Sequence, residues 1–209
     1  MTSPPAPPTP PAPQPTAPPA GRPKDYQLVL PDGWSRIDVR PGPRKRDIAR
    51  LMDAQFRGID AAHALRQQLQ GKLLEMAKAA HASGGIEIYL CHQDILGVPV
   101  PASLVVSLTP EGRDGRAITP QQLAGTFGAG QATLVELPSG TAVRTRRRTV
   151  PEPDDPTGNI LPVTNLDLYV PVPASGRYLV LAFSTNLDPL ADGMVELFDA
   201  IARTLRWAP

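Results

Sequence analysis

The chain has 209 residues, 41% of them hydrophobic, so it is long enough to bury the core of one ordinary domain. Its 21 Lys and Arg side chains nearly balance 20 Asp and Glu side chains, and the formal net charge of +1 argues against a global field that would draw the protein onto nucleic acid or an anionic membrane. The single cysteine, Cys91, excludes an intrachain disulfide and a multi-cysteine zinc or iron–sulfur site.

The first residues consist almost entirely of Pro, Ala and Thr. This composition cannot bury enough apolar surface to offset the entropy of ordering, and it predicts a disordered arm at 1–23 that favours polyproline II. The arm offers proline motifs to an SH3-like or WW-like groove, with Pro10, Pro11 and Pro13 as candidate partner-binding residues. The alternative is a spacer or solubility tail.

The N-terminus lacks the basic opening and apolar run of a signal peptide, and no stretch approaches the roughly 18 apolar residues of a membrane span. We therefore expect a cytoplasmic protein without membrane insertion. Arginine greatly outnumbers lysine, which is typical of GC-rich, actinobacterial genomes.

A single globular domain is expected over 24–209. Its first strands are predicted at 26–30 and 34–39, paired as a hairpin through a Pro-Asp-Gly turn. A helical stretch follows from about 44 to 82, which Gly58 or Gly71 can bend or split. Its apolar positions near helical spacing are Ile48, Leu51, Met52, Phe56, Ile59, Ala62, Leu69, Leu73 and Met76.

The rest of the chain reads mainly as strands and ends in a helix. Strands are predicted at 86–92, 102–108, 132–137, 141–150, 165–172 and 178–184. Thr119 and Pro120 begin a short helix to about Phe127, and Asp188 caps the terminal helix. The predicted core face of that helix is Leu190, Met194, Leu197, Phe198, Ile201 and Leu205. This order predicts an α+β fold, a mostly antiparallel sheet flanked by helices.

Three segments carry a family resemblance. Leu-Pro-Asp-Gly-Trp at 30–34, Tyr-Leu-Val-Leu-Ala-Phe-Ser at 178–184 and the closing helix at 198–207 together resemble the Mog1/PsbP-like domains, over roughly 26–207. The resemblance implies an α/β/α sandwich and a non-catalytic binding or assembly role. It transfers no active-site residues.

The sequence contains none of the common catalytic or nucleotide-binding motifs: no Gly-x-Ser-x-Gly, no His-Glu-x-x-His and no Gly-Lys-Ser/Thr loop. We therefore assign no catalytic, cofactor or metal residues. Cys91 and His92 are neighbours on a predicted strand, so their side chains point to opposite faces and do not form a nucleophile and its base. An enzyme would need a site built from distant residues, such as His92 with Asp94 or Tyr169.

The densest charge cluster is an arginine run on a predicted strand. Alternation sends Arg144, Arg146 and Arg148 to one face, where they are candidate contacts for an acidic partner or for phosphates. The alternative is an exposed strand whose charges discourage edge pairing and are neutralised by the acidic loop at 152–155. No aromatic residues interleave with the arginines, which argues against nucleic-acid binding.

The favoured hypothesis is a non-enzymatic protein-binding or assembly module of a bacterial cytoplasm, without a cofactor. A link to a secretion or envelope-associated machine is a family-level expectation. The alternatives are a small enzyme and a weak nucleic-acid binder that uses the arginine strand. The sequence specifies neither the protein partner nor the oligomeric state.

Overall fold

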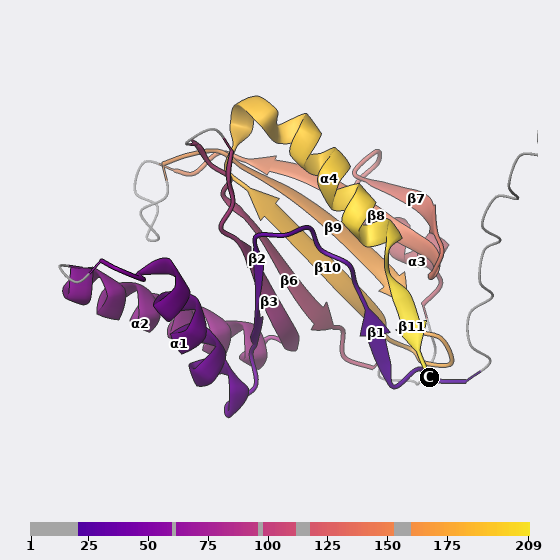
Figure 1. Cartoon of the computed structure of the whole chain (residues 1–209). Coiled ribbons are helices and arrows are strands. Elements are labelled where there is room, and N and C mark those ends of the chain that lie inside the picture. Colours follow the sequence, from indigo (N-terminus) through magenta and orange to yellow (C-terminus); the bar gives the residue numbers. More distant parts are fainter. Residues whose placement is uncertain (1–20, 60–61, 96–97, 112–117, 153–159) are drawn as a thin grey trace, which may run out of the picture.

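The computed structural model describes residues 21–59, 62–95, 98–111, 118–152 and 160–209. Its main element is a seven-stranded antiparallel sheet in the order β2-β3-β6-β10-β9-β8-β7 (Figure 1). These strands are β2 (Trp34–Asp38), β3 (Gly85–Cys91), β6 (Ala102–Leu108), β7 (Ala132–Leu137), β8 (Gly140–Thr149), β9 (Val163–Pro171) and β10 (Tyr178–Thr185). The predicted fold class, an antiparallel sheet flanked by helices, is confirmed.

One face of the sheet is covered by the C-terminal helix. This helix is α4 (Ala191–Arg203), and it follows a single 3-10 turn, η2 (Asp188–Leu190). Phe198 of α4 stacks on Phe183 of β10 with ring centroids 4.8 Å apart, and both side chains are fully buried. Leu104, Leu166 and Leu181 join them in the larger of the two apolar clusters, which forms the core on this face.

The start of α4 differs from the prediction. Asp188 lies in the 3-10 turn and does not cap the helix, because its carboxylate accepts hydrogen bonds from Arg148 instead. Leu190, predicted to be in the core, is 61% exposed, whereas Val195 and Ala202 are buried. The helix is therefore rotated slightly relative to the predicted core face.

The opposite face carries two helices over the β2 end of the sheet. They are α1 (Pro43–Gln55) and α2 (His63–Ala82), so the single predicted stretch is split. The break follows Phe56 and includes Gly58, whose φ of +79° is favourable only for glycine, whereas Gly71 stays inside α2. Ile48 and Met52 of α1 and Ala77 of α2 pack against this face in the second apolar cluster.

The predicted hairpin between the first two strands is wrong. β1 (Asp25–Gln27) pairs with the unpredicted C-terminal strand β11 (Arg206–Ala208), and β2 pairs with β3. Leu28 and Leu30 pack against the larger core, so the chain between β1 and β2 is drawn over the edge of the sheet and does not fold back on itself. Gly33 still makes the predicted turn, with φ +81°.

The remaining elements are short. They are α3 (Pro120–Ala124), β4 (Asp94–Ile95) and β5 (Val98–Pro99). Thr119 caps α3 as predicted and forms a capping box with Gln122, although the helix ends earlier than predicted. Among the residues that the structure describes, no helix has the length and apolar character needed to cross a bilayer.

Candidate functional site

The sheet face opposite α4 is only partly covered. α1 and α2 lie over the β2–β3 end, while α3 lies against β7 and β8. Along the central strands β6 and β10, the half-buried side chains on this face are small or moderate in size. They include Ser103, Val105, Ala182 and Ser184, which we call the open strip. Because side chains alternate along a strand, the large residues Leu104 and Phe183 point to α4 instead.

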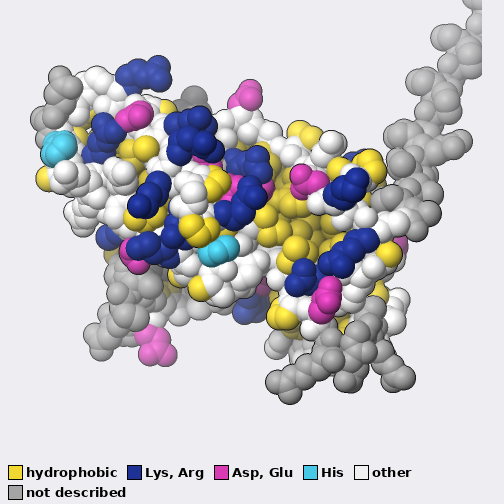
Figure 2. Space-filling view, turned by 90° about the horizontal axis from the view of Figure 1, so that it is seen from below, with side chains coloured by type: hydrophobic (Ala, Val, Ile, Leu, Met, Phe, Trp, Pro, Cys, Tyr) yellow, Lys and Arg dark blue, Asp and Glu magenta, His cyan; other side chains and the backbone are white. Residues whose placement is uncertain are grey.

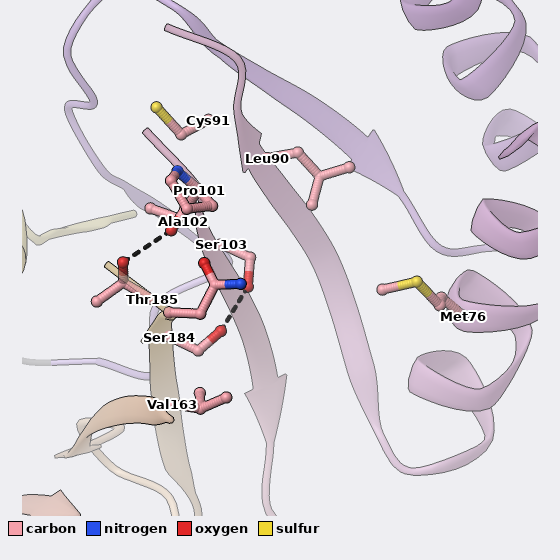
Figure 3. A pocket seen from close by; sticks show the side chains of 10 residues that line it. Met76, Leu90, Cys91, Pro101, Ala102, Ser103, Val163, Ser184 and Thr185 are labelled. Carbon is pink, nitrogen blue, oxygen red and sulfur yellow. Dashed lines mark hydrogen bonds between the residues drawn. The ribbon is translucent and has the colours of Figure 1, made fainter. Parts of the chain in front are cut away.

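A cavity of about 330 Å³ lies at one end of the open strip, between α2 and the sheet (Figure 3). Met76 reaches toward it from α2, Leu90 of β3 lies between helix and sheet, and Val163 of β9 borders the sheet side. The sulfur of Cys91 points away from Met76 and Leu90 (Figure 3). A cavity of this volume is within the range that holds a small ligand or a few side chains of a partner.

The polar groups that line this cavity are hydroxyls, an amide and the Cys91 thiol. The Ser103 and Ser184 hydroxyls hydrogen-bond to each other at 2.7 Å, and the Thr185 hydroxyl donates to the Pro101 carbonyl oxygen at 2.7 Å. Asn186 Oδ1 is buried and has no hydrogen-bond partner among the described residues. The 10 described lining residues include no carboxylate, imidazole or amine that could act as a general acid or base.

The α2 wall of the cavity continues into an exposed apolar flank. Leu65, Leu69 and Met76 are 51%, 36% and 52% exposed, and their spacing places them on one side of the helix. We call this flank and the cavity together the groove. Figure 2 shows a hydrophobic area beside the α1–α2 end of the molecule, bordered by Lys and Arg side chains.

Not all of the apolar positions at helical spacing are buried. Leu69 and Met76 lie on the exposed flank, and Ile59, in the break between α1 and α2, is 53% exposed. α2 contacts the rest of the protein through one side centred on Ala77, its only fully buried residue, and its apolar stripe extends beyond that contact. The surplus apolar side chains therefore stay on the surface.

The arginine run lies on the covered side of the sheet. Arg144, Arg146 and Arg148 share a face as predicted, and that face looks toward α4 and η2. Their ion-pair partners are Asp199 at 2.9 Å, Asp192 at 2.6 Å and Asp188 at 2.8 Å respectively. The charges are thus neutralised within the fold by the C-terminal helix and its first turn. A partner-binding role for these arginines stays a prediction, and it would require breaking these pairs.

Pro10, Pro11 and Pro13 lie outside the described residues, as does most of the acidic loop, 153–159. The role of the proline arm in binding therefore stays a prediction.

The residues of the enzyme alternative are held in separate contacts. His92 Nδ1 lies 3.4 Å from the Ser35 hydroxyl, whereas the Tyr169 ring packs on Phe127 at 5.6 Å between centroids. Within the described parts of the chain, no group of three or more His, Cys, Asp and Glu side chains is arranged to hold a metal ion.

A second polar cluster lies at the β2–β3 end, on the α4 side of the sheet. The buried carboxylate of Glu87 accepts hydrogen bonds from the Tyr26 hydroxyl at 2.6 Å, the Tyr89 hydroxyl at 2.5 Å and Arg36 Nε at 2.8 Å. Burial, reinforced by the hydrogen bond to Glu87, raises the pKa of both tyrosines. A cavity of about 370 Å³ adjoins the cluster. Because every donor points at Glu87, the cluster fastens β1 to the sheet.

Sequence reasoning missed both the groove and the Glu87 cluster. A glutamate inside the apolar run of β3 was a visible signal, since a buried charge needs partners, but the identity of those partners depends on the placement of β1 and β2. The groove had a weaker signal, the excess of apolar residues around α2. Its other wall comes from segments up to 110 positions later in the chain, such as Asn186 just after β10 against Met76.

No protein-family model matches the chain, and no curated protein matches it. Among solved structures, the chain is similar to the solution structure of cyanobacterial PsbP (CyanoP) from Synechocystis sp. PCC 6803. The match has a TM-score of 0.45 and 14% sequence identity, and it covers 87% of this chain and 86% of that chain. The likeness concerns the fold alone.

Proposed function

We propose that this protein is a non-enzymatic binding module of the bacterial cytoplasm, and that its groove receives an apolar segment of a partner protein. The observation that carries the proposal is the cavity beside Met76, continued by the exposed flank of α2. Contiguous exposed apolar surface next to a cavity is typical of a protein-interaction site.

The chemistry of the groove supports an apolar partner segment. Leu65, Leu69 and Met76 leave 51%, 36% and 52% of their surface in water, and covering that surface contributes up to about 1 kcal/mol per side chain. These contributions suit a reversible complex more than a permanent one.

Further features of the proposal concern the setting of the protein. The proline-rich segment 1–23 extends the reach of the domain or adds a second weak contact, which raises avidity. Work in a secretion or envelope-associated machine is the setting implied by the family resemblance.

The test is selection of binding peptides from a random library displayed on phage, with the full-length protein as bait. We expect enriched peptides that bind the wild-type protein and lose at least about tenfold in affinity against Met76→Asp, because a charge in the cavity wall opposes burial of an apolar side chain. Leu134→Asp is the matched control, since Leu134 is 42% exposed on β7, away from the groove.

The expected result supports the groove as the binding site if the control retains wild-type affinity. Failure to enrich any peptide, or enriched peptides that bind Met76→Asp and wild type equally, would overturn the proposal. Circular dichroism of both variants must match the wild type, and Leu69→Asp provides a second groove variant if Met76→Asp does not fold.

A further inference from the structure

We propose that the partner segment is an acidic amphipathic helix, which lies along α2 and inserts its apolar face into the groove. The inference rests on the proposed function, because it names the occupant of the same groove. Three observations carry it: the shape of the apolar flank, the position of the groove within the sheet, and the charge of the two helices beside it.

The shape of the flank fits another helix. Leu65 and Met76 are 11 positions apart, which corresponds to about 16 Å, or three turns, along α2. Leu69 and Lys72 lie between them on the same side of the helix. A partner helix with apolar residues at i, i+4, i+7 and i+11 presents a stripe of matching length, and this is how amphipathic helices dock in apolar grooves.

The position in the sheet argues against a partner strand. The strands that line the groove, β3, β6, β10 and β9, are all interior strands with a neighbour on each side. Their backbone hydrogen-bonding groups are therefore used within the sheet. A partner at this site must bind through side chains, which a helix can do while satisfying its own backbone.

The charge beside the groove is positive. Residues 43–82 carry eight Lys and Arg side chains against four Asp and Glu, a net charge of +4, so the rest of the chain carries −3 to give the overall +1. Figure 2 shows Lys and Arg side chains spread over the α1–α2 end. An acidic segment is attracted to this end of the molecule, whereas a basic one is repelled.

The described acidic side chains of α1 and α2 are already paired. Asp53 binds Arg66, Glu75 binds Lys78 at 2.6 Å, and Asp47 lies 3.8 Å from Arg46. Lys72 is exposed and has no ion-pair partner among the described residues. Since it lies between Leu69 and Met76, it is the cation best placed to meet a carboxylate on a bound helix.

The experiment uses three synthetic 18-residue peptides with one apolar face of Leu and Met at i, i+4, i+7 and i+11. Their polar faces differ only in being rich in Glu, Gln or Lys. Binding to the full-length protein is measured by fluorescence anisotropy. We expect the Glu peptide to bind about tenfold more tightly than the Gln peptide and the Lys peptide to bind most weakly, with the differences shrinking at high salt.

Charge reversal at the groove provides the decisive comparison. Lys72→Glu should remove the preference for the Glu peptide, while Lys24→Glu, which makes the same charge change at an exposed residue just before β1, should leave the order of affinities unchanged. If all three peptides bind the wild type equally and none binds Met76→Asp, the preference for an acidic partner is wrong but the groove remains the binding site. Absence of binding by every peptide would also overturn the acidic helix, whereas the groove itself is judged by the library selection.

Discussion

Glu87 is a carboxylate with 7% of its side chain exposed, and it collects donors from three separate parts of the chain: β1, β2 and β3 itself. Replacing it by Ala leaves the hydroxyls of Tyr26 and Tyr89 and the guanidinium of Arg36 without their acceptor. We expect a loss of about 3 kcal/mol in the free energy of unfolding, measured by urea denaturation. Glu75→Ala, which removes an exposed partner of Lys78, should cost less than about 0.5 kcal/mol. Equal losses in the free energy of unfolding for the two variants would show that the buried Glu87 cluster does not stabilise the fold more than an exposed ion pair.

The tyrosines of the same cluster predict an alkaline limit to stability. Because the folded state holds the pKa of Tyr26 and Tyr89 above the ordinary value near 10, the unfolded chain loses these protons first as pH rises. The stabilisation is complete below about pH 10 and is lost progressively above it, by up to about 1.4 kcal/mol per pH unit for each tyrosine. Tyr89→Phe should therefore flatten the fall in the urea midpoint between pH 10 and 11. A fall as steep as that of the wild type would contradict this assignment.

At the scale of elements, three arginine–aspartate pairs hold α4 and η2 to β8. The pairs differ in exposure: Arg144 and Asp199 are 21% and 20% exposed and bind through two hydrogen bonds of 2.9 Å, whereas Arg146 and Asp192 are 41% and 88% exposed. Partial burial and two-point geometry strengthen an ion pair, while water and salt screen an exposed one.

Double-mutant cycles to Ala test this difference in urea denaturation. We expect a coupling energy of about 1 to 2 kcal/mol for Arg144 with Asp199, and about 0.3 kcal/mol or less for Arg146 with Asp192. Similar coupling in both pairs would mean that burial is not the deciding variable. The Arg148 guanidinium lowers the pKa of the Asp188 carboxyl, so this third pair persists to lower pH than an isolated aspartate would allow.

At the scale of the whole molecule, the two faces of the sheet are covered unequally (Figure 1). α4 and the β1–β11 pair cover one face over a continuous apolar core. Arg144, Arg146 and Arg148 of β8 form ion pairs that hold α4 and η2 on this face. α1 and α2 cover only the β2–β3 end of the other face and bring a surplus of positive charge with them. The groove therefore lies beside the most positively charged part of the molecule. The two binding experiments test whether the apolar surface and the positive charge act together.

The sequence alone determined the features that depend on local physical chemistry. Apolar runs located the strands of the main sheet, Thr119 and Pro120 predicted the start of α3, and the glycine at position 58 marked a place where the long helix can divide. These signals act between residues close in the chain, so no knowledge of tertiary contacts was needed.

Only the tertiary structure decided which elements meet. β1 pairs with β11, about 180 positions away in the sequence. The Asp188 carboxylate accepts a hydrogen bond from Arg148, 40 positions away, and does not cap the helix that follows it. The groove has the same origin: whether an apolar side chain such as Met76 is buried or exposed depends on how far α2 extends over the sheet. Helical periodicity shows which side chains share a flank, but it cannot show which flank finds a neighbour.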